Sequence, residues 1–358
     1  MASQTSMTSL IRSEIVALKK YKLAARPEAI KLNQNEMPYD IPGDIKAKVL
    51  EKLVLIPWNR YPFSQPYSLL NKLSEFYHWP SEGIAVVNGS NVLIQAIVLA
   101  TSLKSRVLAL DPSFSLYELE AKALGNKVDL IPLGENFSFP LKAILEKIEK
   151  TPPSLIFLAN PNAPTANLFP KEEILQVIQK AKCLVVVDEA YCHFADYDLL
   201  SELPSYKNLI LLRTFSKGYG LGGVRLGLAL GHEEIISEIS KVLLPYCVSA
   251  LNEVLVESVL DHPELLEKRV TTLKINRSWL YQAMCAVPHI KVYTSQTNFI
   301  IFQLQDAEKT FQDLLNEGVL IRNVSTPSLP HTLRVSVGTQ EENEKFVKAL
   351  EKVMKNHK

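Results

Sequence analysis

The chain has 358 residues, enough for one large and one smaller domain that each bury a core. Hydrophobic residues make up 47% and charged residues 22%, and a net charge of +1 gives no strong field to attract nucleic acid. The apolar runs, such as residues 96–100, are far shorter than the roughly 20 residues that a membrane-spanning helix needs.

The cysteines and the N-terminal stretch bear on the compartment. Four cysteines, Cys183, Cys192, Cys247 and Cys285, lie far apart and show no C-x-x-C spacing. This usage predicts reduced thiols in a cytoplasmic protein, not a disulfide framework or a zinc site. The N-terminal stretch is rich in Ser and Thr, but residues 11–23 are expected to be helical, which argues against a transit peptide.

From residue 84 onward, short apolar runs end in small or polar residues, and helical stretches follow them. These runs cover residues 84–87, 107–110, 155–159, 184–187 and 209–212. Apolar strands that alternate with helices predict an α/β fold with a mostly parallel sheet and helices on both faces. Ligands collect at the carboxyl ends of such strands. Four polar residues are therefore expected on one rim: Ser90, Asn160, Asp188 and Lys217.

After residue 241 the pattern changes to long amphipathic helices at residues 253–260 and 263–286, and a last helix is expected at 341–354. Strand-like pieces lie between them, at residues 290–293, 299–303, 319–322 and 332–337. This arrangement predicts a smaller α+β domain, with Pro245 as the joint. The expected division is an N-terminal arm of residues 1–35 that packs with the small domain, a large domain of residues 36–243 and a small domain of residues 244–358.

Lys217 is the first candidate for chemistry. It follows an apolar run and precedes Arg225 by eight residues. A lysine forms an imine when its pKa is lowered, which a neighbouring cation and partial burial achieve. Ser216 and Thr214 add hydroxyl donors, and the guanidinium of Arg225 is a bidentate fork for phosphate. The segment predicts a Schiff-base amine beside a phosphate site, with an ordinary surface lysine as the alternative.

Two other rim residues have a chemical and a structural interpretation. Ser90 precedes an expected helix at residues 92–103 and is a candidate N-cap, at a helix start whose free N–H groups bind phosphate; simple capping is the alternative. Asp188 ends an apolar strand and needs a cation or a donor, because burying a bare carboxylate is costly. A protonated pyridine nitrogen is such a partner, and a purely structural role is the alternative.

A glycine-rich segment at residues 218–223 matches the G-x-G-x-x-G pattern, with Glu238 about 20 residues later, as a dinucleotide site requires. The context argues against that site. A dinucleotide fingerprint opens a helix, whereas the next element here is a strand-like run at residues 225–230.

Seven motifs, in order along the chain, carry a family resemblance. They are residues 31–39 (KLNQNEMPY), 59–62 (NRYP), 89–90 (GS), 160–165 (NPNAPT), 188–191 (DEAY), 216–217 (SK) with Arg225, and 333–339 (LRVSVGT). Over nearly its whole length the chain resembles the fold-type-I pyridoxal-phosphate aminotransferases, and most closely the histidinol-phosphate aminotransferase family. The resemblance implies pyridoxal 5′-phosphate as the cofactor.

The resemblance also implies roles for residues that match the motifs. Lys217 would form the Schiff base with the cofactor and shuttle a proton, and Asp188 would pair with the pyridinium nitrogen. Tyr191 and Asn160 would hydrogen-bond the phenolic oxygen, and Tyr117 would stack on the ring. Five residues would hold the phosphate: Ser90, Asn91, Thr214, Ser216 and Arg225.

For substrate and assembly, the resemblance implies a homodimer in which Tyr61 reaches the cofactor of the partner subunit. Arg334 is the expected clamp for the carboxylate of glutamate or the phosphate of histidinol phosphate, and Arg322 is expected to assist it. Guanidinium forks fit both anions. The other expected substrate-site residues are Asn298, Tyr21 and Asn33.

The expected reaction converts L-histidinol phosphate and 2-oxoglutarate to imidazole-acetol phosphate and L-glutamate in histidine biosynthesis, by ping-pong chemistry. Two classes of alternative remain open. One is another fold-type-I enzyme: an aromatic or general amino-acid aminotransferase, or a threonine-phosphate decarboxylase. The other is a non-catalytic binding or regulatory protein with the same fold.

The chain departs from the family pattern at several positions. Asn91-Val92 replaces an acidic pair, Phe63-Ser64 replaces Asp-Pro, Ala163 replaces Asn and Ala166 replaces Gly. Because Asn160 is retained, cofactor binding is expected to survive. The change at Asn91 is expected to alter phosphate or substrate contacts.

Overall fold

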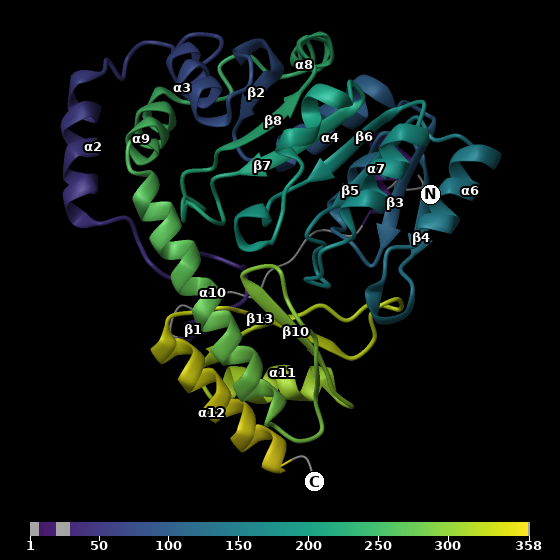
Figure 1. Ribbon diagram of the computed structural model, residues 1–358, viewed down its shortest axis with the longest axis vertical. Helices are drawn as coiled ribbons and strands as arrows, with labels where there is room; N and C mark the ends of the chain where they lie inside the picture. Colours follow the sequence, from purple (N-terminus) through teal and green to yellow (C-terminus); the bar gives the residue numbers. More distant parts are fainter. Residues whose placement is uncertain (1–6, 19–28, 357–358) are drawn as a thin grey trace, which may run out of the picture.

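The computed structural model describes residues 7–18 and 29–356, and Figure 1 shows a larger and a smaller body joined by the long helix α10 (Pro263–Cys285). A seven-stranded sheet forms the centre of the larger body. Its order is β2 (Ile84–Val87), β8 (Gly227–Gly231), β7 (Leu209–Thr214), β6 (Leu184–Asp188), β5 (Leu155–Ala159), β3 (Arg106–Asp111) and β4 (Lys127–Pro132). β8 runs antiparallel to both of its neighbours and the other pairs are parallel, so the predicted mostly parallel sheet is confirmed.

Helices cover both faces of this sheet, as predicted (Figure 1). One face packs against α3 (Tyr67–Tyr77), α6 (Leu141–Lys150), α7 (Lys171–Lys180) and α9 (Ala250–Leu260). The other packs against α4 (Asn91–Thr101), α5 (Leu116–Ala123) and α8 (Glu233–Ser240). Neighbouring strand residues enter opposite layers; for example, Ile156 faces the first set and Phe157 the second. The apolar runs are continuous because both faces are buried.

The smaller body contains an antiparallel sheet with the order β12 (Arg322–Asn323), β13 (Thr332–Ser336), β10 (Phe299–Gln303) and β9 (Lys291–Val292). It packs with α10, α11 (Ala307–Asn316) and α12 (Gln340–Asn356). The strand expected at residues 319–322 is divided at Ile321. Its first part, β11 (Val319–Leu320), pairs in parallel with β1 (Ile30–Lys31), whereas β12 pairs with β13.

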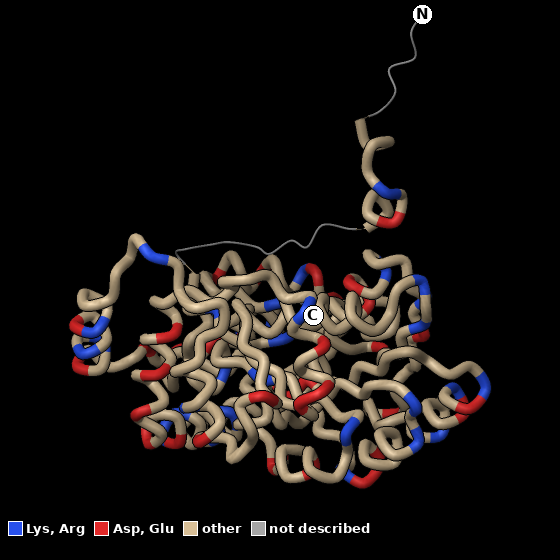
Figure 2. The backbone as a smooth tube through the Cα atoms, turned by 90° about the horizontal axis from the view of Figure 1, so that it is seen from above, with Lys and Arg blue, Asp and Glu red and all other residues tan. Residues whose placement is uncertain are grey.

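The remaining elements are short or peripheral. They are η1 (Met7–Leu10), α1 (Ser13–Val16), α2 (Gly43–Leu55), η2 (Ser81–Gly83), η3 (Glu135–Phe137), η4 (Cys192–Phe194) and η5 (Leu200–Ser205). Of the helix expected at residues 11–23, α1 covers four residues, and residues 19–28 lie outside the described part of the chain. The segment of η1 and α1 stands out from the body (Figure 2), and Arg12 donates a hydrogen bond to the carbonyl of Ala123 in α5.

The hydrophobic cores bear on the domain division. Val256 and Val259 of α9 pack into the core of the large sheet, whereas Val270 of α10 packs into the second core. This packing supports a change of domain inside α10. The division predicted at residue 243 stays a prediction. Figure 2 shows both signs of charge interspersed over the surface. Across residues 7–18 and 29–356, no helix combines the length and the apolar character that crossing a bilayer requires.

Candidate active site

A cavity of about 470 Å³ opens where β5, β6 and β7 end, and the smaller body contributes part of its wall. Eleven residues expected in the site line it: Asn33, Ser90, Asn91, Tyr117, Asp188, Tyr191, Thr214, Ser216, Lys217, Arg225 and Arg334. Three of the four residues predicted on the rim from strand ends, Ser90, Asp188 and Lys217, thus lie in a single concave site, and Asn160 does not. The glycine-rich segment lies between β7 and β8 and opens no helix, so the rejection of a dinucleotide fingerprint is confirmed.

Five expected residues are not in the lining. Tyr61 is 84% exposed and its ring packs against Tyr246. Arg322 lies directly opposite Arg334 across β12 and β13, beside the cavity. Asn298 is buried behind the lining residues, Asn160 points away from the cavity, and Tyr21 lies outside the described residues.

Two glycines allow the end of the cavity beside Arg225 to close tightly. Gly89 has φ 85°, and a Cβ there would lie 2.5 Å from a guanidinium nitrogen of Arg225. Gly227 of β8 lies against the backbone of Ser90, where a Cβ would approach the amide nitrogen to 2.2 Å. Ser90 occupies the N-cap position of α4 as predicted, but its side chain makes no capping hydrogen bond there.

Arg225 is held in place by the loop that follows β7. Its Nη1 donates to Ser216 Oγ and to the Gly222 carbonyl, both at 3.2 Å. The N–H of Ser216 in turn donates to Thr214 Oγ1 at 3.1 Å. Arg225 has φ 60°, a conformation that costs a residue with a side chain about 1–3 kcal/mol. Such strain persists where surrounding contacts over-determine it, and here they aim a guanidinium at the N-terminus of α4.

Lys217 lies at the centre of the cavity, and its Nζ donates to the carbonyl of Gln34 at 2.8 Å. Burial, followed by the positive charge of Arg334, lowers the pKa of Lys217 to about 7, although Glu36 opposes the shift. An amine with this pKa is neutral in a large fraction of molecules at neutral pH. Only the neutral amine is a nucleophile, so the cavity activates Lys217 for attack on a carbonyl.

Asp188 is buried at the end of β6 and receives two neutral donors. The Tyr117 hydroxyl donates to Oδ2 at 2.8 Å and the Ala190 N–H donates to Oδ1 at 3.0 Å. Burial raises the pKa of Asp188, and these hydrogen bonds only partly oppose that rise. A cation placed beside the carboxylate would lower its pKa again. The site therefore suits a ligand with a protonated ring nitrogen.

The aromatic residues near Asp188 are arranged differently from the expectation for Tyr117. Its ring is 1% exposed and stacks on Phe157 at a centroid distance of 4.8 Å and an angle of 2°. Phe114 packs edge-on against Tyr117 and lines the cavity with its own ring. Phe114 was not predicted as a site residue. An aromatic side chain just after the end of β3 was the signal that could have identified it.

Asn160 does not offer its amide to the cavity. Its Oδ1 accepts the Phe169 N–H at 2.9 Å, and its Nδ2 donates to the hydroxyl of Tyr197 at 3.1 Å. Ala163 of the same segment does line the cavity. The family pattern has the longer side chain of Asn at this position. The departure noted at Ala163 thus removes an amide from the cavity wall, and retention of Asn160 does not replace it.

The opposite wall is formed by residues 33–35, which follow β1, and by the smaller body. Arg334 on β13 donates to the carbonyl of Asn33 at 3.0 Å and lies over the ring of Phe299 at 5.1 Å. Asn35 donates from Nδ2 to the hydroxyl of Tyr191 at 2.8 Å. Sequence reasoning missed Asn35, because its partner is 156 residues away in the chain.

Comparison with known proteins agrees with this geometry. The profile of the family described as Aminotransferase class I and II matches residues 27–350. Histidinol-phosphate aminotransferase 2 of Nitrosococcus oceani is 38% identical over 352 residues, which is 97% of this chain and 98% of the relative.

Solved structures share the fold. Histidinol-phosphate aminotransferase from Sinorhizobium meliloti in complex with pyridoxal-5′-phosphate has a TM-score of 0.88 at 21% identity and covers 100% of both chains. L-threonine-O-3-phosphate decarboxylase from Porphyromonas gingivalis has a TM-score of 0.80 at 23% identity and covers 90% of this chain and 99% of its own. Since a transaminase and a decarboxylase share it, the fold alone does not select the reaction.

Proposed function

Because the chain belongs to the class I and II aminotransferases, and within them to the histidinol-phosphate aminotransferases, we propose that it transfers the amino group of L-histidinol phosphate to 2-oxoglutarate. The products are imidazole-acetol phosphate and L-glutamate, a step of histidine biosynthesis. One observation carries the proposal: Lys217, with a pKa of about 7, lines the same cavity as the guanidinium of Arg225 and the buried carboxylate of Asp188.

Pyridoxal 5′-phosphate fits the donor set of the cavity. The amine of Lys217 can react with its aldehyde, and the carboxylate of Asp188 can pair with its ring nitrogen. The guanidinium of Arg225, which lies near the start of α4, can bind its phosphate. The other residues proposed for the phosphate are Ser90, Asn91, Thr214 and Ser216. When bound, this cofactor supplies an electron sink for the bond that breaks at the donor carbon. Lys217, whose pKa of about 7 leaves a large fraction of the amine neutral, would take the proton from that carbon and would return it to C4′ of the cofactor.

The geometry refines the proposed contacts to the cofactor ring. Tyr191 is proposed to donate to the phenolic oxygen without Asn160, whose amide is engaged elsewhere. Phe114 is proposed to cover the ring face, and Tyr117 to position Asp188 from behind. Both residues line the cavity, but the ring of Tyr117 is stacked on Phe157 and its hydroxyl is bonded to Asp188, which leaves Phe114 for the ring face.

The proposed substrate contacts lie on the opposite wall. Arg334 is the anion clamp, and Arg322, its neighbour across the strand pair, assists it. The side-chain oxygen of Asn33 is buried at the cavity and has no hydrogen-bond partner among the described residues. A donor with an N–H group, such as an imidazole, would satisfy this acceptor. Asn298 supports the wall by donating to the carbonyl of Asn35 at 2.9 Å.

A second copy of the chain is the proposed partner. Large apolar side chains are exposed along α2 and the loop after it, and again before α9: Val54, Leu55, Trp58, Tyr61, Phe63 and Leu244. Exposed apolar patches of this kind mark protein contacts. In the proposed homodimer Tyr61 leaves its own subunit and reaches the partner's cavity. The four free cysteines support a reducing compartment, and we propose the cytoplasm.

A single-turnover screen tests the reaction. Holoenzyme is mixed with histidinol phosphate, glutamate, aromatic amino acids or threonine phosphate, and the absorbance of the lysine-bound cofactor is followed without any acceptor. Rapid loss of that absorbance with histidinol phosphate and with glutamate, and its return on adding 2-oxoglutarate, is the expected result. Release of CO₂ from threonine phosphate would establish the decarboxylase instead. No response to any donor, from a normal lysine-bound cofactor, would establish a non-catalytic protein.

A further inference from the structure

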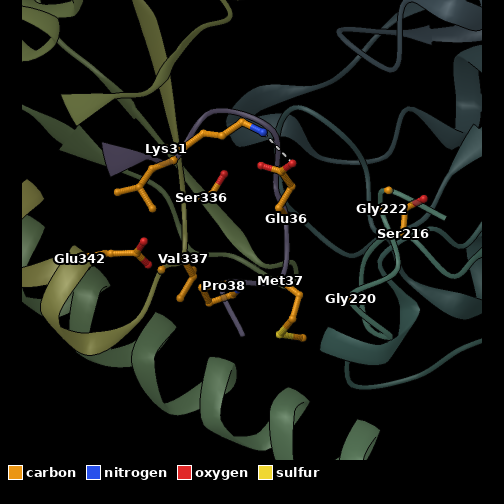
Figure 3. A pocket seen from close by; sticks show the side chains of 13 residues that line it. Lys31, Glu36, Met37, Pro38, Ser216, Gly220, Gly222, Ser336, Val337 and Glu342 are labelled. Carbon is orange, nitrogen blue, oxygen red and sulfur yellow. Dashed lines mark hydrogen bonds and ion pairs between the residues drawn. The ribbon is translucent and has the colours of Figure 1, made fainter. Parts of the chain in front are cut away.

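Residues 33–38, which we call the strap, separate the active-site cavity from a second cavity of about 300 Å³. Residues 33–35 line the first cavity and residues 36–38 line the second. Glu36 on the strap pairs with Lys31 at 2.7 Å, and Figure 3 shows this pair as a dashed line at one end of the second cavity, which Ser336 of β13 also lines. The strap is therefore a wall with space on both sides, and it is bonded to β13 through Ser336 and Arg334.

Asn35 is fixed in this wall by hydrogen bonds to Ser336. It is 1% exposed and has φ 55°, a left-handed conformation that Asn tolerates better than most residues. Its N–H donates to Ser336 Oγ at 2.8 Å, and Ser336 Oγ donates back to Asn35 Oδ1 at 3.2 Å. Because Ser336 Oγ accepts the backbone N–H, its own proton points to the amide oxygen. This leaves the NH₂ end of the amide for Tyr191.

The direction of the Asn35–Tyr191 hydrogen bond has a consequence for Tyr191. A tyrosine hydroxyl has one proton to donate, and in this pair its oxygen accepts the Nδ2–H of Asn35 at 2.8 Å. Asn35 has no acceptor at that end, so the Tyr191 proton is directed away from it. Tyr191 lines the cavity, where the proposed phenolic oxygen requires a donor.

We propose that Asn35, held by Ser336, is a positioning residue that makes Tyr191 a hydrogen-bond donor towards the cavity. This inference rests on the proposed function, because the acceptor is the phenolic oxygen of the proposed cofactor. Ser336 lies two residues after Arg334 on β13, so both face the same side of the strand.

The test is a pH titration of the absorbance of the lysine-bound cofactor in holoenzyme. A hydrogen bond from Tyr191 stabilises the phenolate most when the imine nitrogen has lost its proton, so its loss raises the pKa of that nitrogen. Tyr191→Phe is expected to raise this pKa by about one unit, a tenfold change in the protonation equilibrium. Asn35→Asp keeps the shape and the tolerance of positive φ but offers a carboxylate that attracts the Tyr191 proton.

A double-mutant cycle separates the hydroxyl from the added charge. The direct effect of the carboxylate introduced at position 35 is the same with Tyr or Phe at position 191, so it cancels in the cycle. We expect Asn35→Asp to raise the pKa by about one unit more in the wild-type background than in Tyr191→Phe. Equal shifts in the two backgrounds would overturn the inference.

Ser336 supplies a second, uncharged test. Ser336→Ala removes the group that fixes the Asn35 amide and is expected to shift the titration in the same direction by a smaller amount, whereas Ser336→Thr keeps the hydroxyl and is expected to titrate as wild type. A wild-type titration in Ser336→Ala would contradict the inference even if Asn35→Asp does not fold. Failure of the wild-type chain to form the lysine-bound cofactor would instead contradict the proposed function.

Discussion

The two walls of the active-site cavity are built in different ways. On the sheet side, Asp188 and Lys217 follow buried strands, so the local chain delivers them to the rim. On the strap side, Asn35 and its partner Ser336 are 301 residues apart, and Arg334 reaches the strap from the smaller body. The sheet wall holds the proposed catalytic groups at the ends of buried strands. The strap wall holds the proposed substrate clamp, and a few hydrogen bonds between residues far apart in the sequence connect it to the smaller body.

The largest expected effect is on the sheet wall. Lys217→Ala removes both the Schiff-base amine and the proposed proton shuttle, so activity is expected to fall by at least roughly 10⁴-fold. The absorbance of the lysine-bound cofactor should be absent, while phosphate-site binding of the cofactor remains measurable by fluorescence. Lys345→Ala, which removes an exposed lysine paired with Glu341, serves as the matched control. Persistence of the absorbance in Lys217→Ala would refute the assignment.

The next prediction tests whether Arg334 on the strap side both binds substrate and lowers the pKa of Lys217 on the sheet side. Arg334→Met removes the proposed anion clamp, and kcat/KM for glutamate is expected to fall by about 10²-fold or more. Its positive charge also lowers the pKa of Lys217, so the variant is expected to raise that pKa above about 7.

Two measurements check the Arg334 prediction. Since only the neutral amine captures the cofactor, the capture rate of the apoenzyme rises with pH through the lysine pKa and then levels off. The midpoint should therefore move to higher pH in Arg334→Met. Arg322→Met, one strand further from the cavity, should show a smaller loss in kcat/KM. Equal losses in the two variants would mean that Arg334 is not the primary clamp.

A smaller effect is expected from the support behind Asp188. Tyr117→Phe keeps the ring stacked on Phe157 but removes the hydroxyl that donates to Asp188. That hydrogen bond lowers the pKa of Asp188, so its loss raises the pKa further and weakens the carboxylate as a partner for the ring nitrogen. We expect kcat to fall about tenfold, because a hydrogen bond to a charged group contributes about 1.5 kcal/mol or more.

The control for Tyr117→Phe is Tyr293→Phe. Tyr293 donates to Gln303 in the smaller body, so its variant loses a hydroxyl of the same kind away from the cavity. Its kcat should stay at the wild-type value. A pH–rate profile that is unchanged in Tyr117→Phe would show that the tyrosine only packs.

The sheet wall was predictable because its signals are local. Apolar runs predicted β2, β3, β5, β6 and β7, and the polar residue after each run predicted the rim. β4 was missed because it is a partly exposed edge strand in which Lys127 and Asp129 prevent a continuous apolar run. Periodicity also gave no sign that residues 319–323 serve two different sheets.

Within the site, the structure adds side-chain directions that the motifs did not contain. Asn160 follows the predicted strand at residues 155–159, but its amide is bonded to Tyr197, and the hydroxyl of Tyr117 is turned towards Asp188. Ala163 and Phe114, which line the cavity, are neighbours in the same two segments. A motif identifies the segment, whereas the packing of the surrounding rings and amides decides which of its residues faces the ligand.

The smallest expected effect lies at Ala166, which joins the segment after β5 to the smaller body. This alanine is 0% exposed and has φ 66°, its N–H donates to Asn162 at 2.9 Å, and its carbonyl accepts the Gln296 N–H of the smaller body at 2.7 Å. Ala166→Gly loses a buried methyl, worth about 0.8 kcal/mol, but relieves a left-handed conformation that costs an L-residue about 1 kcal/mol. The added freedom of glycine in the unfolded chain costs about 0.4–1 kcal/mol, so we expect a net loss of stability below about 1 kcal/mol.

The matched control is Ala229→Gly on β8, which removes an equally buried methyl from a residue with ordinary extended backbone. With no strain to relieve, and with added freedom in the unfolded chain, it should lose about 1–2 kcal/mol. Urea unfolding of both variants measures the difference, which equals the strain held at Ala166. Equal losses would mean that Ala166 holds no measurable strain, and that glycine at this position in the family pattern reflects something other than backbone conformation.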